Sequence, residues 1–131
     1  MDEENWQPII EDTGEITNSN GVLISKARQM FFERFGEQPI NVCKDKYGTI
    51  AYEYNKVILC AKDYIYGYIV SCHKDLVIFA KNKNKKLVMY INKTLSKFYE
   101  FDVEDILNSG TENKRGGNIM MNFNIKLGVH F

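Results

Sequence analysis

Apolar residues recur at helical spacing in one segment near the start of the chain. Gly36 and Pro39 follow its last apolar residue and are typical signals for the end of a helix. We therefore expect an amphipathic helix over residues 21–35, with Ser19 or Asn20 capping its start. Its apolar stripe consists of Leu23, Ala27, Met30, Phe31 and Phe35.

From residue 40 onward the spacing of apolar residues falls to about two, which is typical of strands. Short polar segments separate the apolar ones and favour turns. Asp102 is placed to cap a short helical turn through Leu107, and we expect a loop over residues 109–118. The predicted strands cover residues 40–44, 49–54, 57–61, 64–70, 76–80, 87–91 and 97–101, followed by one long or two short strands over 119–131.

Closely spaced strands with short turns favour an antiparallel meander, because parallel pairs need long crossover connections. The predicted fold class is α+β, with one N-terminal amphipathic helix packed on an antiparallel meander sheet. We expect about six to eight strands in that sheet, which is either a curved sheet or a partly open barrel. The domain prediction is an acidic N-terminal arm over residues 1–19 and a single α+β domain over residues 20–131.

Acidic and basic residues balance over the chain, with 17 of each, but they are unevenly placed. Residues 1–16 contain six acidic residues and no basic one, whereas residues 74–97 contain seven lysines and one aspartate. Zero net charge argues against a global positive field for nucleic acid or membrane, and leaves local nucleic-acid binding open. Four lysines of a predicted hairpin loop form either a solvated surface or a basic contact surface for phosphate or an acidic partner: Lys81, Lys83, Lys85 and Lys86.

Three tyrosines alternate with smaller residues in one predicted strand. Tyr64, Tyr66 and Tyr68 are expected to point to one side of it, with Ile65 and Ile69 on the core side. Tyrosine offers a large contact area and loses little conformational entropy, which suits a protein contact or stacking on bases. In the alternative interpretation the rings are half-buried against each other or under the helix, with their hydroxyls in solvent.

The glycine-rich segment over residues 109–118 is a second candidate contact. Its backbone amides can hold a phosphate, with Lys114 and Arg115 as ligand contacts. It lacks both the Walker spacing and the strand–loop–helix order of a dinucleotide site. A flexible connector is therefore the alternative interpretation.

No spacing in the sequence indicates catalysis, a cofactor or a metal. The chain has three cysteines: Cys43, Cys60 and Cys72. An odd number without a Cys-x-x-Cys pair argues against a disulfide framework and against a zinc site. The acidic residues from Glu100 to Asp105 are better explained by helix capping than by acid–base catalysis. We therefore expect a non-enzymatic protein without a cofactor or a metal.

Two features bear on where the protein works. Neither a basic apolar leader nor an apolar stretch of about 20 residues is present, so we expect a cytoplasmic protein with no membrane partner. The composition is rich in Asn, Ile and Lys and poor in Arg and Pro, which favours an AT-rich bacterial or phage source.

Residues 87–106 carry a family resemblance. A strand, Leu87–Ile91, leads to the segment Lys97-Phe-Tyr-Glu-Phe-Asp-Val-Glu-Asp-Ile106, which resembles a pattern of bacterial pleckstrin-homology-like domains. The resemblance implies a partly open barrel of seven strands closed by a C-terminal helix. This chain departs from that architecture, because its clear helix is N-terminal and its end is a predicted strand, so no functional residue is carried over.

The first functional hypothesis is a small interaction module of bacterial or phage origin that binds and modulates a protein partner. Host–phage or toxin–immunity conflict would be its setting, and the tyrosines, the lysines and the acidic arm its contacts. The second is a small-ligand or nucleotide pocket lined by Phe31, Phe35, Tyr52 and Tyr54. An unrecognised small enzyme is a third alternative, and edge strands would permit a homodimer.

Overall fold

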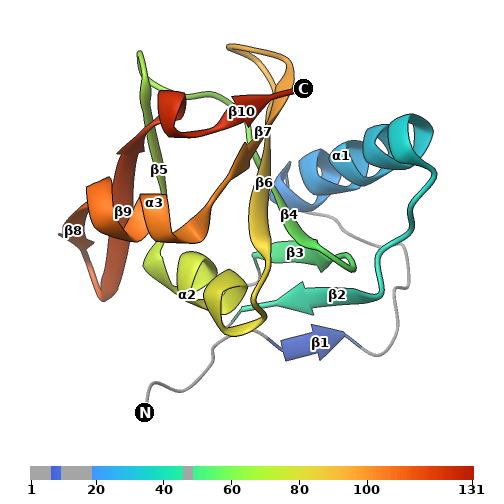
Figure 1. Ribbon diagram of the computed structural model, residues 1–131, viewed down its shortest axis with the longest axis horizontal. Helices are drawn as coiled ribbons and strands as arrows, with labels where there is room; N and C mark the ends of the chain where they lie inside the picture. The colour runs from blue at the N-terminus through green and yellow to red at the C-terminus, as the bar shows by residue number, and fades with distance from the viewer. Residues whose placement is uncertain (1–6, 10–18, 46–48) are drawn as a thin grey trace.

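The computed structural model describes residues 7–9, 19–45 and 49–131, and most of the predicted acidic arm lies outside these ranges. Within them, three α-helices accompany two β-sheets (Figure 1): α1 (Ser19–Phe35), α2 (Lys74–Asn82) and α3 (Val103–Ser109). The α+β class is confirmed. Among the described residues, no helix has both the length and the apolar character needed to span a bilayer.

The strands form two sheets, whereas one was predicted. The larger sheet has seven strands, in the order β1 (Gln7–Ile9), β2 (Asn41–Lys44), β3 (Ile50–Glu53), β4 (Val57–Lys62), β6 (Lys86–Ile91), β7 (Lys97–Phe101) and β10 (Val129–His130). The smaller has three, in the order β5 (Ile69–His73), β9 (Asn118–Asn124) and β8 (Thr111–Arg115). A 3-10 turn, η1 (Ile125–Leu127), leads from β9 to β10.

A crossover connection overturns the predicted all-antiparallel meander. Strands β4 and β6 pair in parallel, from Val57↔Lys86 to Lys62↔Ile91, and the chain passes through β5 and α2 between them. The other pairs among the described strands are antiparallel. The predicted strand over residues 76–80 belongs to α2, whose buried residues are Leu76, Val77, Phe79 and Ala80. A short apolar run has no period of its own, so strand and helix cannot be told apart there.

Two further predictions were wrong in position. The strand predicted over residues 64–70 begins only at Ile69, so its first residues form a connection instead. The loop predicted over residues 109–118 contains strand β8, which pairs with β9 around a turn at Gly116, where φ is +63°. Every residue of β8 is exposed, so no hydrophobic alternation marked it as a strand.

The clearest local signals gave correct elements. Helix α1 covers the predicted range and ends before Gly36, whose φ of +69° suits glycine. Helix α3 follows Asp102, whose side chain accepts a hydrogen bond from the Glu104 backbone N–H at 3.0 Å. The predicted strands over 40–44, 49–54, 57–61, 87–91 and 97–101 are all present with small changes at their ends.

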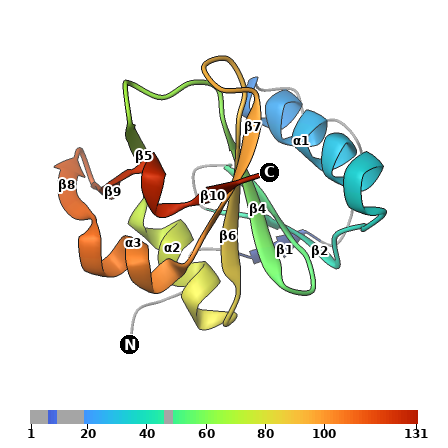
Figure 2. The same cartoon turned by 45° about the horizontal axis from the view of Figure 1, so that its top comes forward.

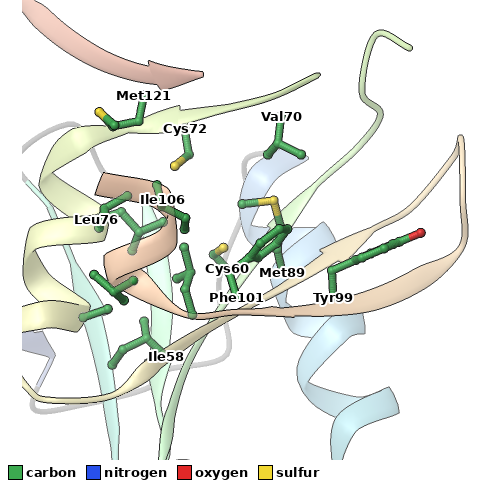
Figure 3. Packing of buried hydrophobic residues seen from close by; sticks show 14 of the residues in the cluster. Ile58, Cys60, Val70, Cys72, Leu76, Met89, Tyr99, Phe101, Ile106 and Met121 are labelled. Atoms are coloured by element: carbon green, nitrogen blue, oxygen red, sulfur yellow. The ribbon is translucent and has the colours of Figure 1, made fainter. Parts of the chain in front are cut away.

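The large sheet lies between two hydrophobic cores (Figure 2). Helix α1 covers one face, while α2, α3 and the small sheet lie on the other. The core beneath α1 includes Ile24, Phe31, Tyr52, Tyr54 and Leu59. The core between the sheets, part of which Figure 3 shows, includes Ile58, Met89, Phe101, Ile106 and Met121.

Candidate functional site

Residues 63–68, which connect β4 to β5 and are called the tyrosine loop below, present three aromatic rings to solvent. Tyr64, Tyr66 and Tyr68 are 49%, 77% and 62% exposed. The Tyr66 hydroxyl donates to the Tyr64 hydroxyl at 3.1 Å, and the two rings meet edge to face with centroids 5.2 Å apart. This hydrogen bond raises the pKa of Tyr66.

The backbone of the tyrosine loop is fixed on its inner side. Ile65 is buried in the core between the sheets, and its N–H donates to the Thr94 hydroxyl at 3.1 Å. Gly67, with φ of +58°, allows a tight turn in which the Ile69 N–H donates to the Tyr66 carbonyl at 3.1 Å. Ile69 is half exposed, which corrects its predicted place in the core.

Tyr68 is separately anchored at the end of the loop. Its carbonyl accepts from the Ile125 N–H at 2.7 Å, and the Lys126 ammonium lies 4.7 Å from the centre of its ring. The loop therefore combines exposed rings with a backbone held by hydrogen bonds, an arrangement that loses little entropy when a partner binds.

A groove of about 340 Å³ between this loop and the small sheet brings two predicted contacts together. Its lining residues include Tyr64 and Tyr66 of the loop and Arg115 at the end of β8. Lys114 is exposed on the same strand but is not among the lining residues. The Ser71 hydroxyl oxygen, which is buried, has no hydrogen-bond partner in the described part of the chain. We call this feature the tyrosine groove.

The four predicted lysine contacts lie elsewhere, and most of their charge is already offset. The Lys81 ammonium is 3.7 Å from the Glu104 carboxylate, and that of Lys86 is 3.9 Å from Glu100. The Lys83 ammonium lies 5.7 Å from the centre of the Phe79 ring. Lys81 lies in the last turn of α2, Lys83 caps that helix and Lys86 begins β6, so the predicted hairpin loop is wrong. Two residues of the acidic segment 100–105 serve as counter-charges for these lysines.

Lys85 is a structural residue. Its ammonium donates to the Glu53 carboxylate at 2.6 Å and to the Tyr54 carbonyl at 2.6 Å. The side chains of Lys85 and Glu53 are only 12% and 6% exposed. Burial raises the pKa of Glu53, but the hydrogen bonds from Lys85 and Asn41 outweigh it, and the net shift is downward.

The structure separates the tyrosines from the lysines. Lys86 lies where the parallel strands β4 and β6 begin, and the tyrosine loop leaves β4 where it ends. Six strand residues span about 20 Å at about 3.3 Å per residue. The two groups therefore cannot form one compact contact patch.

The predicted aromatic pocket is absent from the described residues, because its walls are core. Phe31, Tyr52 and Tyr54 fill the space beneath α1, with the ring centres of Phe31 and Tyr54 4.6 Å apart. Phe35 is half exposed near the end of the helix, where its ring contacts Phe131. Phe31, Tyr52 and Tyr54 therefore contribute to the packing beneath α1 and do not line an open pocket.

The three cysteines are free and buried. Burial raises the pKa of the Cys60 thiol and raises that of Cys72 to about 12, so both thiols stay protonated near neutral pH. Among the described residues, His, Cys, Asp and Glu side chains form no group of three that could hold a metal ion.

Sequence reasoning missed a cavity of about 470 Å³ beside the end of β4. Its walls come from α1, β3, β4, β5, α2 and β6, which only the crossover connection brings together. A prediction of a helix over residues 74–82 could have revealed the cavity. A helix in that connection allows β4 and β6 to pair in parallel, which brings the walls of the cavity together.

No family model, curated protein or solved structure matches this chain. The resemblance of residues 87–106 to pleckstrin-homology-like domains therefore stays a prediction.

Proposed function

We propose that this protein is a non-enzymatic interaction module that binds a protein partner through the tyrosine loop and the tyrosine groove. The observation that carries the proposal is the exposure of three tyrosine rings on a backbone that is itself fixed. A loop that merely connected two strands would gain nothing from rings in water. Tyr64 and Tyr66 do pack against each other, as the alternative interpretation holds, but none of the three tyrosines belongs to the core beneath α1, and Tyr66 and Tyr68 are mostly exposed.

The residue types support a protein partner. Tyrosine and arginine are enriched among the residues that dominate binding energy, since each combines a large contact area with hydrogen bonding. Tyr64 and Tyr66 supply apolar area, and Arg115 offers donors to a carboxylate or carbonyl across the groove.

The test replaces the two paired rings. A Tyr64→Ser/Tyr66→Ser variant is used beside wild type to capture partners from source cells, and affinity for each purified partner is measured by calorimetry. We expect binding to weaken by about 100-fold or more, because two central aromatic contacts are each worth about 1–2 kcal/mol.

The matched control is Phe32→Ser, which removes a ring of similar exposure from α1, on the other side of the large sheet. This variant should keep the affinity of wild type. Equal loss in both variants, or equal affinity of the double variant and wild type, would contradict the proposal.

A further inference from the structure

The cavity beside the end of β4 lies where the large sheet divides. The ladder between β3 and β4 covers only Tyr52↔Leu59 and Glu53↔Ile58, whereas β4 stays paired with β6 as far as Lys62. Past Leu59 the pairing of β3 with β4 ends, and residues from the first turns of α1 and from the junction of β5 with α2 line the space. Ligands of α/β proteins commonly bind at this position, beyond the carboxyl ends of parallel strands.

The inner walls of the cavity are apolar and rich in sulfur. Cys60 and Met89 occupy neighbouring positions on β4 and β6, and Cys72 and Leu76 come from β5 and α2. Figure 3 shows these four side chains within the core between the sheets. Because both thiols are held in their neutral form, these walls carry no charge and suit an apolar group.

The mouth of the cavity is polar and carries a connected set of side chains. The Lys26 ammonium donates to the Asn92 side-chain oxygen at 3.0 Å, and the Asn92 amide donates to the Asp63 carboxylate at 3.0 Å. The second carboxylate oxygen of Asp63 lies 3.0 Å from the Lys93 ammonium. The hydrogen bonds from Asn92 and Lys93 lower the pKa of Asp63, which therefore stays ionised and already has its cation.

Lys62 differs from the other charged side chains at the mouth of the cavity, which are hydrogen-bonded or paired. It lines the cavity and is only partly exposed, yet no hydrogen bond or ion pair of its ammonium is found in the described ranges. By the alternation of a strand it shares the face of β4 that carries Ile58 and Cys60. Its charge acts on both buried thiols and partly offsets the rise in their pKa. A partly buried cation without a counter-ion favours an anion beside it.

We infer that this cavity binds an organic anion with an apolar body, whose carboxylate or phosphate group lies against the Lys62 ammonium. The body occupies the sulfur-rich interior, and the volume is that of a site for a small molecule. The inference goes beyond the proposed protein contact and does not depend on it.

A pair of matched probes tests the inference. The probe 8-anilinonaphthalene-1-sulfonate has an aromatic body and one negative charge, and N-phenyl-1-naphthylamine has the same body without the charge. We expect the folded full-length protein to bind the anionic probe at one saturable site. Lys62→Gln should weaken that binding by about tenfold, as expected for one charge-assisted contact, and leave the neutral probe unaffected.

Two variants serve as controls, each checked for an unchanged melting curve. Lys62→Arg keeps the charge and should keep anion binding, and Lys97→Gln removes an exposed lysine outside the cavity and should change nothing. Decanoate and decyl phosphate should displace the anionic probe at about tenfold lower concentration than decanol, and the stronger anion identifies the preferred head group. Equal binding of the anionic probe by Lys62→Gln and wild type, equal displacement by decanol, or no saturable site would overturn the inference.

Discussion

The contacts of Lys85 predict that it stabilises the fold. Replacing it by Met keeps a similar length and apolar stem but removes the ammonium that bonds Glu53 and the Tyr54 carbonyl. The Glu53 carboxylate would then remain buried with the Asn41 side chain, at 2.8 Å, as its remaining donor. Removing the cation leaves the buried carboxylate charge uncompensated, which strongly destabilises the folded state.

The expected loss is large for a protein of this size. Removing one partner of a buried ion pair costs about 3–5 kcal/mol, against a total stability of about 5–15 kcal/mol. With about 3–5 °C of melting temperature per kcal/mol, Lys85→Met should lower Tm by about 10–25 °C at pH 7.

The measurement is thermal and denaturant unfolding of Lys85→Met beside Lys81→Met. The Lys81–Glu104 pair is more than half exposed on both sides and 3.7 Å long, so its loss should cost less than about 1 kcal/mol. Equal losses in the two variants would refute the reasoning, because burial would then make no difference.

The ion pair between Lys85 and Glu53 also makes the stability of the folded protein depend on pH. The pKa of Glu53 is lower in the folded protein than in the unfolded chain, so its stabilising effect is complete above its ordinary value of 4.5. That effect is lost as the pH falls through the folded pKa. The gap in stability between wild type and Lys85→Met should therefore be widest at pH 7 and narrow below about pH 4.5. A gap that stays constant down to pH 3 would contradict this account.

Four further predictions concern single residues. The buried Tyr54 hydroxyl has no partner in the described part of the chain, so Tyr54→Phe should stabilise the protein by about 1 kcal/mol in denaturant unfolding; a clear loss would reveal an acceptor. A Cβ at Gly128 would lie 2.6–3.0 Å from ring carbons of Phe101, so Gly128→Ala should cost about 1–3 kcal/mol. Asp102→Ala removes the cap of α3 and should cost about 1 kcal/mol in the same assay. Because burial raises the pKa of Cys72 to about 12, little thiolate is present at pH 8, so its thiol should react with Ellman's reagent far more slowly in the folded protein than in the unfolded chain; equal rates in the two states would contradict this account.

Local chemistry explains which elements the sequence could predict. The α1 stripe ends at a glycine with positive φ, and Asp102 caps α3, because both signals act within a few residues. Strand β8 left no such signal, since its charged residues are all exposed and only pairing with β9 makes it a strand.

The candidate site followed the same division. Exposed tyrosines beside a buried Ile65 were predictable from their alternation, although the segment is a connection and not a strand. The role of Lys85 was not predictable, because its partner Glu53 is 32 residues away, at the end of β3. The sequence of a lysine-rich segment therefore shows that positive charge is concentrated there. It does not show which of the lysine side chains is buried in the fold.

The crossover connection explains why the predicted meander was wrong, and it also forms the cavity beside the end of β4. Reading residues 76–80 as a strand makes a meander possible, and in a meander β4 and β6 need not end at the same edge. Because those residues form α2, β4 and β6 pair in parallel and end at the same edge of the sheet. Asp63 and Asn92 follow these two strands beside the cavity, and the Asn92 amide nitrogen lies 3.0 Å from the Asp63 carboxylate oxygen. The same connection carries the tyrosine loop, so Lys62 lines both the cavity and the tyrosine groove. A ligand against Lys62 would thus lie two residues from Tyr64, which places the two proposed contacts within reach of one another.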